Sequence, residues 1–161
     1  MASVANMNRP AFGLPGRIQA PNSKPRSIAL VGLGAGGAAI ARRISGEGIA
    51  QLDVHVFASA SGTDALADIK SGGEDLQRAL GTADMIFIVT SHGDDVGLAP
   101  VVSRVAHSGN HPVTALYIVP ADAALSEGED DTLKTLRAGV EMLVVVSDES
   151  YVAAMIAALG G

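Results

Sequence analysis

The sequence predicts an α/β fold: three layers, with helices on both faces of a doubly wound, parallel five-stranded sheet. Three observations carry this prediction. Residues 27–37 (SIALVGLGAGG) form an apolar strand that runs into a glycine-rich loop, and the stretch after it has helical spacing. Strand-like and helix-like segments alternate strictly from Ser27 onward. The stretches ALVG, MIFIVT, TALYIV and MLVVV are apolar throughout, which is typical of parallel strands buried on both faces.

The elements follow from this alternation and from the turn residues between them. Strands are expected at 27–32, 53–58, 84–90, 112–119 and 141–147. Helices are expected at about 36–44, 64–69, 74–80, 97–108, 126–139 and 151–159. Ser126 is the expected N-cap of the helix at 126–139, and Asp148 or Ser147 that of the last helix. The expected strand order is 2-1-3-4-5, a Rossmann-like arrangement, with any ligand above the switch point between strands one and three.

Length and composition set the domain organisation and exclude several classes of function. Residues 1–26 contain four prolines and are expected to be an extended N-terminal arm, and residues 27–161 suffice for one domain with a core. The net charge of −6 gives no basic footprint for nucleic acid. With no cysteine there is no disulfide, thiolate metal site or cysteine nucleophile. No apolar run reaches the ~18 residues of a membrane span, so a cytoplasmic protein is expected.

The glycine-rich loop is the first candidate site. Gly32, Gly34, Gly36 and Gly37 place bare backbone N–H groups where a helix begins, and such a cradle binds phosphate. The same glycines also fit a tight strand-to-helix turn that holds no ligand, and the sequence leaves both interpretations open.

Several segments, taken in order, resemble the N-terminal GTPase half of FtsZ, the bacterial tubulin homologue. They are SIALVGLGAGGAAIARRI, VHVFASASGTDAL, ADMIFIVT, GLAPVV, HPVTALYIV and LRAGVEMLVVVSDESYV, and they span about residues 27–159. The resemblance implies GTP or GDP as the nucleotide. It places the phosphates on the loop Gly32, Gly34, Ala35, Gly36 and Gly37, with Thr90, Ser91 and Gly93 flanking them and Thr63 and Asp64 near the ribose or the far phosphates.

The chain also departs from the FtsZ pattern. Where the family has a run of glycines and threonines around the triphosphate, this chain has the shorter Ser91-His92-Gly93-Asp94-Asp95, which brings two carboxylates close to the expected phosphates. The family's long central helix, acidic hydrolysis loop and second domain have no counterpart in these residues. No catalytic residue and no metal ligand is therefore assigned.

Three functions follow, in order of preference. The first is a degenerate, non-hydrolysing FtsZ-like protein that serves as an assembly or accessory subunit of a larger complex or homo-oligomer. The second is a GTP- or GDP-binding switch with slow or partner-dependent hydrolysis. The third is an NAD(P)-binding Rossmann protein, since Gly32-x-Gly34-x-x-Gly37 fits that fingerprint, although Ala58-Ser59-Ala60 replaces the expected ribose-binding acid.

The remaining candidate residues have two interpretations each. Asp94 and Asp95 either hold Mg²⁺ or cap the helix that follows, and we favour the cap. His92 is either an acid–base group or a loop histidine without a chemical role, and we favour the latter. The last helix, YVAAMIAAL, is apolar on nearly every face, so it is expected, together with the N-terminal arm, to contact a protein partner or a second copy.

Overall fold

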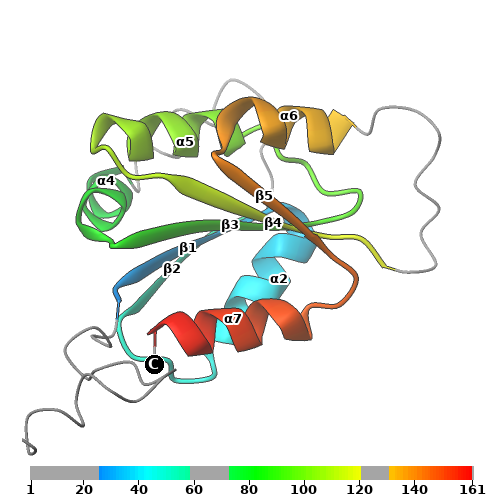
Figure 1. The fold of residues 1–161 in the computed structure, drawn as a ribbon, viewed down its shortest axis with the longest axis horizontal. Coiled ribbons are helices and arrows are strands. Elements are labelled where there is room, and N and C mark those ends of the chain that lie inside the picture. The colour runs from blue at the N-terminus through cyan, green and yellow to red at the C-terminus, as the bar shows by residue number, and fades with distance from the viewer. Residues whose placement is uncertain (1–25, 59–72, 121–130, 161) are drawn as a thin grey trace, which may run out of the picture.

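The computed structural model describes residues 26–58, 73–120 and 131–160, which form a three-layer α/β unit (Figure 1). In chain order the elements are β1 (Ile28–Leu33), α2 (Gly34–Ser45), β2 (Leu52–Phe57), α4 (Gly73–Thr82), β3 (Met85–Ser91), α5 (Ala99–Ser108), β4 (Val113–Ile118), α6 (Asp131–Gly139), β5 (Met142–Val146) and α7 (Ser150–Gly160). The expected N-terminal arm, the helix at 64–69 and residues 126–130 of the fifth expected helix, Ser126 included, lie outside the described residues.

The five strands are all parallel and follow the order β2-β1-β3-β4-β5, which confirms the predicted fold class and strand order. In this register Leu30 of β1 lies between Val54 of β2 and Phe87 of β3. Because all strands run the same way, their carboxyl ends share one edge of the sheet, towards the right in Figure 1. The loops after β1 and β3 therefore meet there.

The two faces of the sheet carry separate hydrophobic clusters. Figure 1 shows α5 and α6 over one face, where Val102 and Leu136 pack with the α4 residue Leu80. On the opposite face Ile40 of α2 and Ile156 of α7 pack together with the other side of the strands. Alternate residues of β1 belong to different clusters, because successive side chains of a strand point to opposite faces of the sheet. This explains why the central strands are apolar at every position.

Strand β5 is an edge of the sheet, and the prediction that MLVVV is buried on both faces is wrong. Met142 and Val145 expose 59% and 48% of their surface. Among the described strands only β4 pairs with β5, so one row of its backbone N–H and C=O groups has no described strand beside it. A short apolar run has no periodicity that distinguishes an edge strand from a central one.

Helix α7 covers the sheet with one side only. Val152 and Ile156 are buried against the strands, whereas Ala154, Ala157 and Ala158 are exposed. Tyr151 is a large side chain on this helix that is not buried, and 64% of its surface is exposed. The interface expected at this helix stays a prediction. Among residues 26–58, 73–120 and 131–160, no helix has the length and hydrophobicity to cross a bilayer.

Element ends differ from expectation where a cap or turn decides them. Helix α2 begins at Gly34, earlier than predicted, and α5 begins at Ala99, later than predicted. Before α7 the Asp148 carboxylate accepts the amide of Ser150 at 2.8 Å, so Asp148 rather than Ser147 plays the expected capping role. This hydrogen bond lowers the pKa of Asp148.

The contrast between central and edge strands can be measured. Leu116 of β4 is fully buried, so Leu116→Ala is expected to lower the free energy of unfolding by about 2–5 kcal/mol. Val145→Ala on the neighbouring edge strand is expected to cost less than about 1 kcal/mol, because Val145 is half exposed. Urea unfolding of both variants checks this, and equal losses would contradict the assignment of β5 as an open edge.

Candidate functional site

The glycine-rich loop lies at the switch point of the sheet, between the adjacent strands β1 and β3. Helix α2 leaves β1 towards one face of the sheet, and α5 follows β3 on the opposite face (Figure 1). The loop 92–98 therefore passes directly over the N-terminus of α2. In open parallel sheets, ligands bind at such a switch point, outside the carboxyl ends of the strands.

The carboxylate of Asp94 occupies the anion cradle at the start of α2. Its Oδ1 accepts the amide of Gly36 at 3.0 Å, and its Oδ2 accepts the amide of Gly37 at 2.8 Å. The same Oδ2 accepts the amide of Ser91 at 2.8 Å and lies 3.4 Å from the Thr90 hydroxyl. Three backbone donors thus converge on one side chain, as they would on a phosphate. The helix N-terminus adds its partial positive charge to this contact.

Two of the loop glycines make room for this side chain. Gly34 has φ +78°, and a Cβ added there would lie 2.4 Å from the Asp94 Cβ. A Cβ on Gly36 would lie 2.7 Å from the Ser91 Cβ and 2.9 Å from the Asp94 carboxylate. All three distances are shorter than real Cβ contacts, so any larger residue would push the loop off the helix.

The other two glycines serve packing. A Cβ on Gly37 would lie 2.3 Å from the Val89 carbonyl oxygen of β3, and one on Gly32 would lie 2.6 Å from the Gly37 carbonyl oxygen. They let the first turn of α2 lie directly against β1 and β3. Ala35 is exposed on that turn. The four glycines are thus accounted for by contacts within the chain.

The two acidic residues of the loop have different roles, and neither caps α5 as predicted. Asp94 caps α2, a helix that lies almost sixty residues earlier in the chain. The Asp95 carboxylate accepts the amide of Gly97 at 2.9 Å and closes a local turn, while α5 begins without a side-chain cap. Gly93 has φ +85°, and its turn carries the chain back so that Asp94 reaches the cradle.

His92 is tied to a buried tyrosine. Its Nδ1 lies 2.9 Å from the hydroxyl of Tyr117, which is fully buried at the carboxyl end of β4. The amide of His92 also donates to the carbonyl of Ile118 at 2.8 Å. The imidazole thereby satisfies a hydroxyl that would otherwise be costly to bury. His92 thus has a hydrogen-bond partner within the fold, and the absence of a catalytic role stays a prediction.

The remaining predicted site residues fall outside this cluster. Thr63 and Asp64 lie outside the described residues. In the part of the chain that the structure describes, no three His, Asp or Glu side chains come together as a metal site. The structure thus brings together Gly36, Gly37, Thr90 and Ser91 of the predicted set, with Gly32, Gly34 and Gly93 in supporting positions.

Sequence reasoning missed Asp94 as the occupant of the cradle. Its signal was present, since a carboxylate stands where the resemblance places phosphates. The sequence did not show that the loop after β3 lies close enough to the glycine cradle for Asp94 to reach it. The parallel register, which pairs Gly32 of β1 with Val89 of β3, brings the two together.

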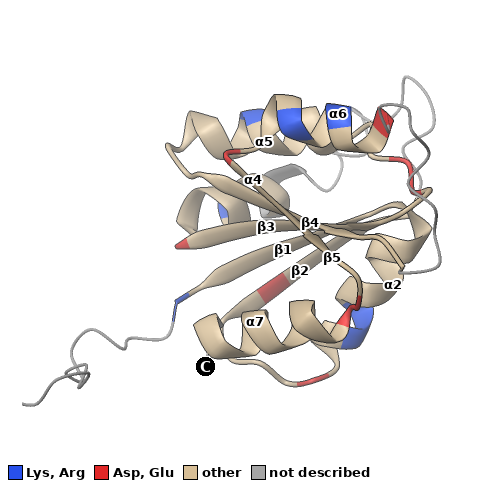
Figure 2. Cartoon of the chain, turned by 45° about the vertical axis from the view of Figure 1, so that its right-hand side comes forward, with Lys and Arg blue, Asp and Glu red and all other residues tan. Residues whose placement is uncertain are grey.

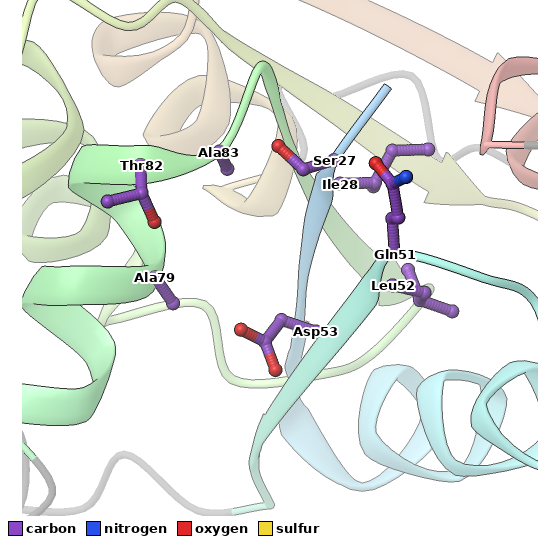
Figure 3. Close-up of a pocket in the computed structure, with 8 residues that line it drawn as sticks. All are labelled: Ser27, Ile28, Gln51, Leu52, Asp53, Ala79, Thr82 and Ala83. Carbon is purple, nitrogen blue, oxygen red and sulfur yellow. The ribbon is translucent and has the colours of Figure 1, made fainter. Parts of the chain in front are cut away.

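A separate hollow of about 380 Å³ lies at the opposite, amino-terminal edge of the sheet (Figure 3). Figure 3 shows it between α4, which contributes Ala79 and Thr82, and the starts of β1 and β2. Its polar lining includes Asp53 and Ser27, and the Ser27 hydroxyl is already bonded to the Asp84 carboxylate at 3.2 Å. Ligands of parallel sheets bind at the carboxyl ends of the strands, so this hollow is not the expected site.

No protein-family model matches the chain, and a search of curated proteins finds no match either.

Asp94 and Asp95 form a matched pair for testing the cradle. Asp94→Asn removes the charge and replaces one accepting oxygen by a donor, so it is expected to cost about 1–3 kcal/mol of unfolding free energy. Asp95→Asn makes the same change in net charge, but Asp95 is exposed and holds a single amide, so a loss below about 1 kcal/mol is expected. Urea unfolding at neutral pH compares them, and similar losses would show that the cradle contact contributes little.

Proposed function

We propose that this protein is a non-hydrolysing binding or assembly subunit built on an FtsZ/tubulin-like nucleotide-binding fold. The observation that supports the proposal is that the Asp94 carboxylate accepts hydrogen bonds from the amides of Gly36, Gly37 and Ser91. The chain supplies its own anion at the position where a hydrolysing relative would need a phosphate.

Electrostatics favour this occupancy over a nucleotide. A phosphate entering the cradle would compete for the same three amides and would meet a carboxylate at hydrogen-bonding range. Two like charges at 4 Å repel by about 4 kcal/mol at an effective dielectric of 20. A tethered carboxylate also loses less entropy on binding than a free ligand does. Asp94 thus has to leave before a triphosphate can enter.

An assembly role is supported by the open edge of the sheet. The large side chains Met142, Val145 and Tyr151 are exposed, and all three lie on β5 or α7. Strand β5 also carries no charged residue, whereas edge strands are usually protected by charges or prolines. An apolar strand whose outer backbone groups pair with no described strand is suited to pairing with a strand of another chain.

A GTP- or GDP-binding switch is the second candidate, and the intact donors of the cradle favour it. If Asp94 swings out, the amides of Gly36 and Gly37 become available to a phosphate. NAD(P) binding stays the third candidate, because the strand-two acid of that fingerprint is missing from the sequence.

Nucleotide binding separates the first two candidates. Calorimetry of the wild-type chain with GTP or GDP, each with and without Mg²⁺, is expected to show no binding at millimolar nucleotide, and a steady-state assay no GTP hydrolysis. Asp94→Ala removes the competing carboxylate and is expected to tighten GDP binding at least about ten-fold. Asp95→Ala, with the same charge change, is the control. Tight binding by the wild type would overturn the proposal in favour of the switch, and a fluorescence titration with NADH tests the third candidate.

The edge of the sheet can be tested independently. Val145→Lys places a charge on β5 and is expected to abolish self-association or partner binding, as measured by native mass spectrometry of the full chain isolated from its source. Thr82→Lys, on the exposed end of α4, adds the same charge elsewhere and is expected to leave assembly unchanged. A wild-type chain that is monomeric at high concentration and carries no co-purifying protein would contradict the assembly role.

A further inference from the structure

The groove between α5 and α6 has two lining residues, Ser103 and Arg104, whose donors have no acceptor among the residues that the structure describes. It has a volume of about 320 Å³, within the range of small-molecule sites, and lies on the face of the sheet away from α2 and α7. Its lining is Pro100, Ser103, Arg104, His107, Ala138 and Gly139. The cradle of Asp94 takes no part in it.

Ser103 is the unusual residue of this groove. Its side chain is 2% exposed, and its hydroxyl has no hydrogen-bond partner within the described residues. A buried hydroxyl left unpaired costs free energy, so its place needs an explanation. Gly139 of α6 stands opposite, and a Cβ added there would lie 3.2 Å from the Ser103 Oγ. Gly139 thus packs close to the Ser103 Oγ, which has less than 1 Å² of accessible surface, so a ligand in the groove reaches the hydroxyl only when α6 shifts away.

Arg104 supplies a cationic donor next to this hydroxyl. Its guanidinium is exposed and makes no hydrogen bond or ion pair with any residue that the structure describes. Figure 2 shows that basic residues gather on the outer side of α5 and α6, although the chain as a whole has a net charge of −6. A guanidinium matches the planar geometry of carboxylate and phosphate groups.

The remaining polar wall is fixed in place. His107 pairs through Nε2 with the Glu141 carboxylate. Glu141 also accepts the amide of Val113 at 2.7 Å, and this bond is the main cause of its lowered pKa. Glu141 is not among the groove-lining residues, and its carboxylate is engaged by these two donors. The groove thus presents the unpaired guanidinium of Arg104, the unpaired hydroxyl of Ser103 is buried behind its wall, and its lining residues include no carboxylate.

We propose that this groove binds a small molecule through a carboxylate or phosphate group, with Arg104 as the charged anchor and Ser103 as a buried donor that a shift of α6 makes accessible. The inference does not depend on the proposed function, because it concerns different residues on a different face of the fold.

The test is a titration of the full chain with inorganic phosphate and, separately, with citrate, followed by amide NMR shifts at ionic strength matched with sodium chloride. Saturable shifts are expected at Ser103, Arg104, Ala138 and Gly139. The anion that saturates at the lower concentration distinguishes the phosphate from the carboxylate class.

Two variants make the result specific. Arg104→Gln is expected to weaken binding at least about ten-fold, and Ser103→Ala about five-fold. Arg42→Gln removes an exposed arginine of α2, outside the groove, and is expected to bind as the wild type does. Shifts that do not saturate with either anion, or saturation that Arg104→Gln and Arg42→Gln affect equally, would overturn the proposal.

Discussion

The contact between Asp94 and the first turn of α2 is the interaction on which the carboxyl edge of the sheet depends. It joins a loop that follows β3 to a helix that follows β1, and both of its oxygens take part. Without it, three backbone amides at a switch point would need water or a ligand. With it, the positive φ of Gly34 and the absence of a side chain at Gly36 become requirements of the fold itself.

This constraint changes what a glycine-rich loop implies. Such a loop after a buried strand usually indicates a bound phosphate, because glycine lets the backbone approach an anion. Here the approaching anion is part of the same chain, and Gly32 and Gly37 are explained by the close packing of α2 on β1 and β3. Every glycine of the motif therefore has a structural cause. The motif alone does not discriminate between a loaded nucleotide site and one closed by its own carboxylate.

How much the sequence predicts depends on whether a property is local. Strand order follows from apolar runs and strict alternation, both readable along the chain, and it is confirmed. The exposure of Val145 and the partner of Asp94 are not local, because they depend on which strand ends the sheet and which loops face each other. The unpaired hydroxyl of Ser103 is of the same kind. Its sequence context, an apolar helix, gives no sign that Gly139 of another helix stands opposite.

Because Asp94 fills the cradle, the sites proposed for binding lie elsewhere in the fold. Two of them, the open strand β5 and the groove between α5 and α6, both contact helix α6. Its Leu133 and Leu136 belong to the cluster that also takes in Leu143 of β5, while Ala138 and Gly139 form one wall of the groove with α5. A close-packed helix moves as a unit, because its apolar side cannot shift without opening a void. A ligand that displaces α6 in the groove would therefore also displace the open strand beside it. The proposed groove site and the open strand thus share the packing of α6, away from the switch point that Asp94 closes.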